Sequence, residues 1–395
     1  MRWILWIAMI CFVGDAWAGS STRNIKLCFK YQVEFSDGAV GDWTDTTMTA
    51  YGVYFYVENK TTGSQEFYWA DKETGCKTVT FHTRYRYKIR MQSKAKVTND
   101  NIVTVRVSAS NPTNFGWTAD SSFNPSPKAR ESTTFTWPTD PGGNYTKKVS
   151  NVIAAASFSL YRRWGGLKGK TFVAYREPCN ADGGSCLKAD PNGGLAIFLS
   201  HKGGTKNKFQ ISHEIGHLLA AKANQNGRTK TSGYGLDHRT NSKASECADG
   251  SRSYSHHFYS EEYASSAANE GLAHFYAAAI WNWPKKKDCS WYSYYDGSTL
   301  SCEDGTKYLI NTCHKGKKPK LHSGNELDWM RFWWDVHSDC DIGFASIMEI
   351  WDRSNPHKWR DGKVYRKLKR AARRCLNSTQ YACFKSEASK NGVTW

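Results

Sequence analysis

The pentapeptide HEIGH, residues 213–217, lies within the stretch KFQISHEIGHLLAAKAN (208–224). Residues four apart lie on one face of a helix, so His213 and His217 can present two imidazole nitrogens to a single ion. Glu214 leaves the helix one position further round and flanks such an ion, where a carboxylate can act as general base on a metal-bound water. The spacing therefore predicts a zinc-dependent hydrolytic site.

A catalytic zinc site needs a third protein ligand, because zinc normally takes three side chains and keeps a fourth position for water. One common arrangement places Gly three residues and His six residues after the second His, but this chain has Ala220 and Ala223 there. Other acidic and imidazole side chains follow in polar, turn-rich sequence, where a fixed ligand is harder to justify: Asp237, His238, Asp249, His256 and His257.

Glu270 is the stronger candidate for the third ligand. It lies in the predicted helix SEEYASSAANEGLAHFYAAAIWN (260–282), which opens with Ser260 as N-cap and two acidic residues, and which Pro284 follows. The surrounding alanines let another helix approach closely, and His274 follows four residues later on the same face. Metal ligation explains a carboxylate in the middle of such a small, apolar helix.

HEIGH followed by NEGLAH (269–274) resembles the zincin metallopeptidases of the gluzincin type. The resemblance implies that His213, His217 and Glu270 hold Zn²⁺, and that Glu214 polarises the water and passes its proton to the leaving amine. The family commonly has an acidic residue four positions after the ligand Glu, where it supports a ligand His. This chain has His274 at that position, so the supporting role is in question there.

Gluzincins usually add a Tyr or His that stabilises the oxyanion of the tetrahedral intermediate. The candidates for this role are Tyr276, His314, His322 and His337. His337 lies in the predicted helix NELDWMRFWWDVHSD (325–339), whose aromatic stripe favours a core position. The resemblance also implies a strand antiparallel to substrate just before the active helix, and GGLAIFLS (193–200) fits. It covers residues 149–282 and leaves the rest of the chain unexplained.

The region before the site alternates apolar and polar residues with period two, which is typical of half-buried strands. The pattern runs through residues 25–35 and 79–91, and two further strands are predicted at 51–57 and 102–107. Residues 19–140 therefore read as an antiparallel β-sandwich-like domain. The stretch WPTDPGGNY (137–145), with two prolines and two glycines, marks the boundary.

Beyond this boundary longer helices mix with strands. A helix is predicted at 149–164, strands at 170–177 and 193–200, and the helices of the two motifs follow. This mixture indicates an α+β fold, with a zincin-like metallopeptidase domain over residues 145–395.

The first eighteen residues have the anatomy of a secretory signal peptide: Arg2, an apolar run, and an A-x-A cleavage site at 16–18. Cleavage would leave eleven of the twelve cysteines, which in an exported protein read as disulfides with one thiol free or paired between chains. Proximity predicts the pairs Cys28–Cys76 and Cys179–Cys186, and a pair Cys375–Cys383 near the C-terminus. The five others are Cys247, Cys289, Cys302, Cys313 and Cys340.

The net charge of +18 favours anionic partners, and basic residues cluster at 285–287, 315–320 and 358–374. No specific nucleic-acid motif and no transmembrane segment accompany this charge. The leading hypothesis is an extracellular zinc endopeptidase (periplasmic in a Gram-negative bacterium) acting on protein or peptide substrates. The alternative is a catalytically silent zincin scaffold that binds partners through its β-domain and basic surface. The β-domain could also be a prodomain removed on activation.

Overall fold

The computed structural model describes residues 21–98, 101–108, 111–115, 120–125, 130–137, 144–162, 172–179, 184–190, 195–200, 203–223, 264–283, 289–293, 297–302, 325–354 and 364–394. Within these ranges helices combine with several sheets, which agrees with the predicted α+β class. The signal-peptide prediction falls outside them. None of the helices described there has the length and apolar character needed to cross a membrane.

The smaller of the two large sheets is built on β1 (Thr22–Gln32). β10 (Ser132–Trp137) lies parallel to it, while β5 (Cys76–His82) and β2 (Thr47–Thr49) pair with it in antiparallel fashion. The predicted alternation holds, because Ile25, Leu27, Phe29 and Tyr31 all lie in the core. Cys28 and Cys76 face each other in register and form the predicted disulfide.

The larger sheet has nine strands. Its main path runs β12 (Cys186–Ala189), β13 (Leu195–Phe198), β11 (Phe172–Tyr175), β7 (Asn101–Ser108), β6 (Tyr87–Thr98), β3 (Val53–Asn59) and β4 (Gln65–Trp69). β8 (Asn111–Phe115) pairs with β7, and β9 (Asp120–Phe123) pairs with β6. β11 is parallel to both of its neighbours. Strands from both sides of the predicted boundary at 140–145 thus share one sheet.

Two sequence predictions differ from these sheets. The continuous pattern at 79–91 belongs to two strands, β5 and β6, which lie in different sheets with a turn between them. Across this turn the hydroxyl of Tyr87 accepts a hydrogen bond from the backbone N–H of His82. The parallel pairs β1–β10 and β7–β11 also make the β region mixed instead of purely antiparallel.

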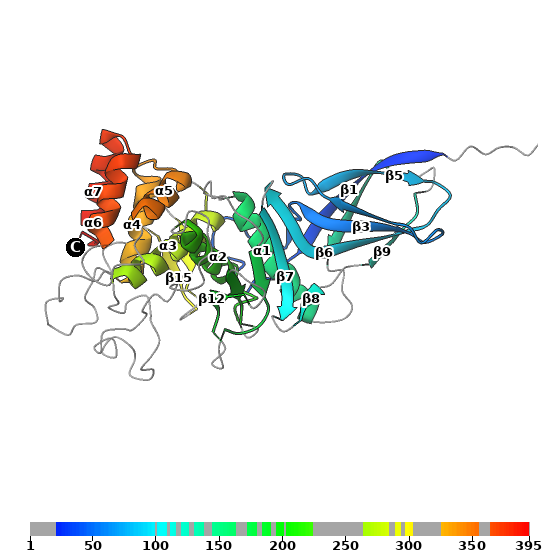
Figure 1. Ribbon diagram of the computed structural model, residues 1–395, viewed down its shortest axis with the longest axis horizontal. Coiled ribbons are helices and arrows are strands. Elements are labelled where there is room, and N and C mark those ends of the chain that lie inside the picture. The colour runs from blue at the N-terminus through cyan, green and yellow to red at the C-terminus, as the bar shows by residue number, and fades with distance from the viewer. Residues whose placement is uncertain are drawn as a thin grey trace, which may run out of the picture.

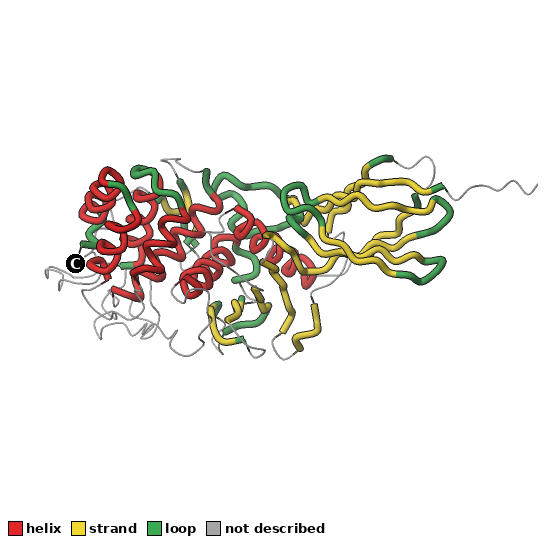
Figure 2. Tube along the Cα trace, turned by 45° about the horizontal axis from the view of Figure 1, so that its top comes forward, coloured by secondary structure: helices red, strands yellow, loops and turns green. Residues whose placement is uncertain are grey.

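The helices described from residue 144 onward include four that were predicted and three that were not. The predicted helices are α1 (Asn144–Arg162), α2 (Lys208–Ala223), α3 (Ala264–Trp281) and α4 (Glu326–Ser338), and the others are α5 (Phe344–Ser354), α6 (Val364–Cys375) and α7 (Ser378–Lys390). In Figure 1 the strands β1, β3, β5, β6 and β9 gather at one end of an elongated molecule and α4 to α7 lie at the other, while α1 to α3 lie between, with β12 and β15 beside them. Figure 2 shows the same order from a second direction. One hydrophobic cluster runs through all these layers.

Helix α1 anchors the end of β1. The Ser150 hydroxyl donates to the carbonyl of Gln32 at 2.7 Å, and the Asn151 side chain bonds both the N–H and the carbonyl of Glu34. Residues 149–160 of α1 are buried on every face, as expected for a helix enclosed by other layers. The β strands and the helices that follow are therefore packed together as one body.

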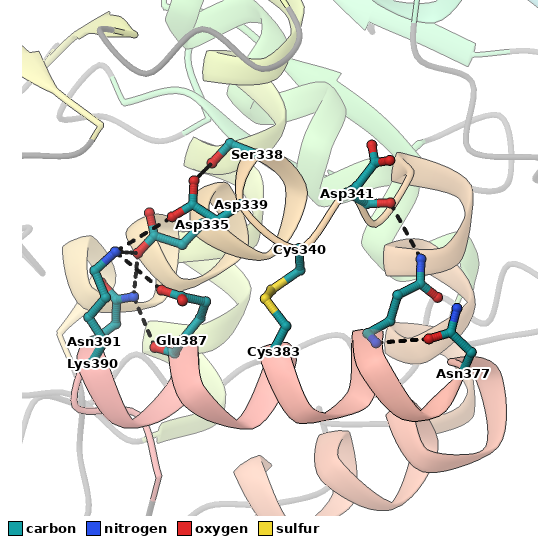
Figure 3. The surroundings of a disulfide bond; sticks show 11 residues. Asp335, Ser338, Asp339, Cys340, Asp341, Asn377, Cys383, Glu387, Lys390 and Asn391 are labelled. Carbon is teal, nitrogen blue, oxygen red and sulfur yellow. Dashed lines mark hydrogen bonds and ion pairs between the residues drawn. A yellow bond between two sulfur atoms is a disulfide. The ribbon is translucent and has the colours of Figure 1, made fainter.

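The last helices are joined by a disulfide between Cys340, just after α4, and Cys383 on α7, as Figure 3 shows. Beside it Lys390 lies 3.1 Å from Asp335 and 3.2 Å from Glu387. The predicted pair Cys375–Cys383 is therefore wrong, because Cys383 faces α4 and not the end of α6. Cys375 is the one free cysteine among the described residues.

The other cysteine predictions have mixed outcomes. Cys179 and Cys186 form the predicted disulfide. Cys289 and Cys302 pair across the hairpin of β14 (Ser290–Tyr292) and β15 (Thr299–Ser301). Cys247 and Cys313 lie outside the described residues.

Candidate metal centre

Side-chain acceptors hold the N-terminus of helix α2, which begins five residues before His213. The Asp37 carboxylate, in the segment after β1, accepts hydrogen bonds from the backbone N–H groups of Lys208 and Phe209, each at 3.0 Å. The Asn207 side chain accepts a third from Gln210 at 2.9 Å. These acceptors satisfy N–H groups that a helix start leaves unpaired, and a negative charge there suits the helix dipole.

Helices α2 and α3 touch at Gly216, the glycine of HEIGH. A Cβ atom built on Gly216 would lie 2.8 Å from Cα of Ala273, which is closer than real Cβ atoms come, and 3.1 Å from its carbonyl oxygen, which is tighter than most such contacts. The absence of a side chain at this position therefore sets the distance between the two helices. That close approach brings the α2 histidines opposite Glu270.

The side chains of His213, His217 and Glu270 converge on one point. His213 Nε2 lies 2.9 Å from His217 Nε2, and Glu270 Oε2 lies 3.1 Å from the first and 3.0 Å from the second. All three side chains are buried. Donor atoms of a tetrahedral zinc site stand about 3.3–3.5 Å apart, so shifts of a few tenths of an ångström would admit the ion. Two imidazoles and one carboxylate are also a donor set that catalytic zinc uses. The residues fit zinc.

The surroundings of His213 favour its neutral form. The pKa of His213 is lowered to about 3, chiefly by burial and further by His274 and His217, against the raising effect of Glu270. At neutral pH His213 therefore keeps a nitrogen lone pair for an ion, as metal binding requires. Glu214 lies in the same turn of α2 and is 4% exposed. Its role as general base remains a prediction.

Asn269, which the sequence did not single out, lies against the second histidine. Its side-chain nitrogen is placed 2.8 Å from Nδ1 of His217. A histidine that binds metal through Nε2 carries its proton on Nδ1 and donates it to an acceptor. In the orientation shown, the amide nitrogen faces Nδ1 of His217. The amide oxygen of Asn269 would be that acceptor if the amide were turned by 180°, since the two ends of an amide are told apart only by their hydrogen bonds. The only signal in the sequence was its place beside Glu270.

His274 lies at the edge of the same cluster. Its ring centroid is 4.2 Å from that of His213 and 5.0 Å from that of Trp291. One donor atom each from His213, Glu270 and His274 lie within 4.8 Å of one another, a second grouping able to hold a metal ion. On its other side His274 Nε2 lies 3.0 Å from Glu326 Oε2. Glu326 was also missed, because an acidic residue in the first turn of a helix is common without any further role.

Two of the four predicted oxyanion candidates, Tyr276 and His337, lie in the core. Tyr276 packs against Phe344, and six residues along α3 turn its direction by about 120° from that of Glu270. His337 packs near Phe275, and its Nδ1 lies 2.9 Å from the carbonyl of Ile342. An oxyanion role for either stays a prediction. The remaining candidates lie outside the described residues: Asp237, His238, Asp249, His256, His257, His314 and His322.

The strand expected to face substrate has both of its edges paired. β13 lies between β12, which is antiparallel to it, and β11, which is parallel to it. β12, four residues long, is the outer strand at that end of the sheet. A substrate strand adding to this end of the sheet would therefore meet β12 and not β13, because an edge strand offers the unpaired N–H and carbonyl groups.

No protein-family model matches this chain, and no curated protein matches it either. The zincin resemblance accordingly remains a prediction carried by the two motifs and by the convergence of their side chains.

Proposed function

We propose that the protein is a secreted zinc-dependent endopeptidase that hydrolyses peptide bonds of proteins or peptides. The observation that supports this most is the triangle of His213 Nε2, His217 Nε2 and Glu270 Oε2, whose sides measure 2.9–3.1 Å. The four disulfides among the described residues are compatible with an extracellular location.

The residues divide the chemistry between them. His213, His217 and Glu270 would hold Zn²⁺, which when bound supplies a Lewis acid that lowers the pKa of a water molecule. Glu214 would accept a proton from the attacking water and deliver it to the nitrogen of the leaving amine as the peptide C–N bond breaks. Asn269, with its amide oxygen turned towards Nδ1, would fix the tautomer and orientation of His217.

Substitution of Glu214 by Gln tests the function, because it removes the proton acceptor and leaves the ligands in place. We expect hydrolysis of casein to fall by a factor of ~10² or more, with zinc content unchanged by elemental analysis. A chelator should abolish wild-type activity, and zinc should restore it. The exposed substitution Glu73→Gln is the matched control. Wild-type rates in the Glu214→Gln protein would refute this mechanism.

A second candidate function rests on α6. Its buried side consists of Val364, Tyr365, Leu368, Ala371 and Ala372, and its outer side carries Arg366, Lys367, Lys369, Arg370, Arg373 and Arg374. No carboxylate of the described residues forms an ion pair with these four arginines. Such a basic face suits an anionic polymer. A non-catalytic binding protein would use it, and so would a protease held at an acidic surface.

Chromatography on a sulfated polysaccharide distinguishes binding by the basic face of α6 from binding by the overall positive charge of the protein. Replacing Arg366, Arg370 and Arg373 with Gln should lower the salt concentration of elution. The control removes three cations from β6 (Lys88, Arg90 and Lys94), two of which lie over aromatic rings. If both variants elute at equally lowered salt concentrations, only the overall charge determines binding.

A further inference from the structure

A carboxylate on α4 is buried beside the candidate metal centre. Glu326 is the first residue of α4 and is fully shielded from solvent, as is His274 on α3. Glu326 Oε2 and His274 Nε2 lie 3.0 Å apart. A buried carboxylate is costly unless it is paired and hydrogen-bonded, so this contact is one that the fold must maintain.

Two local features hold Glu326 in this place. Asn325 and Asp328 form a reciprocal capping box that fixes the start of α4. At Gly271 an added Cβ would come within 2.7 Å of the carbonyl of Glu326 and 2.8 Å of the N–H nitrogen of Met330. Only glycine therefore lets α3 and α4 approach this closely. The N-terminal turn of α4 also stabilises a negative charge at Glu326.

His274 connects this carboxylate to the metal cluster. Its ring packs on that of His213 with centroids 4.2 Å apart and planes tilted by 37°, and Trp291 packs at 5.0 Å from it. Rotation of His274 would move it against His213, whose Nε2 is one corner of the ligand triangle. Groups that orient a ligand histidine are worth about 10–100-fold in metal affinity.

We propose that Glu326 is a positioning residue, which fixes the ring of His274 and through it the orientation of the ligand His213. This inference rests on the proposed zinc site. Its distinctive consequence is that the effect of Glu326 on metal binding passes through His274.

The test measures Zn²⁺ affinity by competition with a chromophoric chelator, together with the thermal stability of the metal-free protein. Glu326→Gln keeps the shape of the side chain and removes its charge, and we expect zinc affinity to fall about 10-fold or more. Asp328→Asn is the matched control, because it weakens the cap of the same turn without touching His274. That variant should lose stability and keep its zinc affinity.

A double-mutant cycle shows whether His274 carries the effect. His274→Phe keeps a flat ring on His213 and removes the hydrogen bond. In this background Glu326→Gln should no longer change zinc affinity. Equal losses in both backgrounds, or no loss in the wild-type background, would overturn the proposal. Zinc affinity is measured without a proteolysis assay, so the two proposals can fail separately. If the wild-type protein binds zinc but cleaves no substrate, and Glu326→Gln still weakens zinc binding, the endopeptidase proposal is refuted and the positioning role stands.

Discussion

At the scale of single residues, Glu270 is the side chain on which the ligand set depends. Without it the site keeps two imidazoles whose Nε2 atoms lie 2.9 Å apart, with no carboxylate to offset the charge of a divalent ion. We expect Glu270→Ala to lower zinc affinity by more than the roughly 10–100-fold that loss of a supporting group costs. Chelator competition would measure this. Unchanged affinity would place the third ligand elsewhere, for example at Asp237 or Asp249.

The sequence predicted the candidate ligands of the cluster better than the residues that hold them in place. His213 and His217 could be named because helix geometry brings residues four apart to one face. Glu270 could be named because a carboxylate in a small, apolar helix calls for a ligand role, and because the resemblance to gluzincins implies one. Glu326 could not, since it approaches His274 from a helix 52 residues further along the chain. Contacts of that kind depend on how helices pack, and the local sequence of α4 does not indicate that Glu326 meets His274.

At the scale of elements, Gly216 controls the contact of α2 with α3. Alanine is normally better than glycine inside a helix by about 1 kcal/mol. Here its Cβ would meet the backbone of Ala273 at 2.8 Å. We expect Gly216→Ala to destabilise the protein by about 1–3 kcal/mol in urea unfolding, because overpacking forces the helices apart. Zinc affinity should fall as well.

Gly203→Ala is the control for this substitution, since no atom lies within 4 Å of a Cβ at that position. It should leave both stability and zinc affinity close to wild type. If Gly216→Ala is as stable as the wild type, the interhelical contact is looser than its distances indicate.

Lys208, at the start of α2, makes the stability of the folded protein depend on pH. Its Nζ donates to the carbonyls of Trp43 at 2.8 Å and Gly38 at 3.2 Å, in a fully buried position. Burial lowers its pKa from 10.5 to about 8, although Asp37 opposes the shift. Between these values the unfolded chain binds more protons than the folded one. The lowered pKa of Lys208 therefore makes the folded protein more stable as the pH rises from 8 to 10.5, and less stable as the pH falls back towards 8.

Comparison of wild type with Lys208→Met isolates that term. The variant should be less stable by about 1–3 kcal/mol, because two buried carbonyls lose their donor. The difference should widen between pH 8 and pH 10, at a rate of at most ~1.4 kcal/mol per pH unit. Urea unfolding at several pH values would measure it. A constant difference would mean that Lys208 titrates normally in the folded protein.

At the scale of the whole molecule, strand partners were the feature hardest to foresee. Period-two alternation predicts that a segment is a half-buried strand, yet it carries little information about which strand lies beside it. β7 and β11 pair in parallel across the predicted domain boundary, and β5 and β6 separate into different sheets. The predicted elements were therefore mostly present, whereas the arrangement that joins them depended on long-range pairing.

The shared sheet bears on whether the β-region is a removable prodomain. β11 pairs with β7, and the N-terminus of α2 is held by Asp37. A chain restricted to residues 145–395 would expose the β7-facing edge of β11 and lose that cap.

We therefore expect the 145–395 fragment alone to lack a cooperative unfolding transition and to bind Zn²⁺ poorly. Co-expression with residues 19–140 should restore both properties, because the missing strand and cap return. Circular dichroism during heating and chelator competition would measure them. A fragment that folds and binds zinc alone would show two independent domains, and the β-region could then be removed on activation.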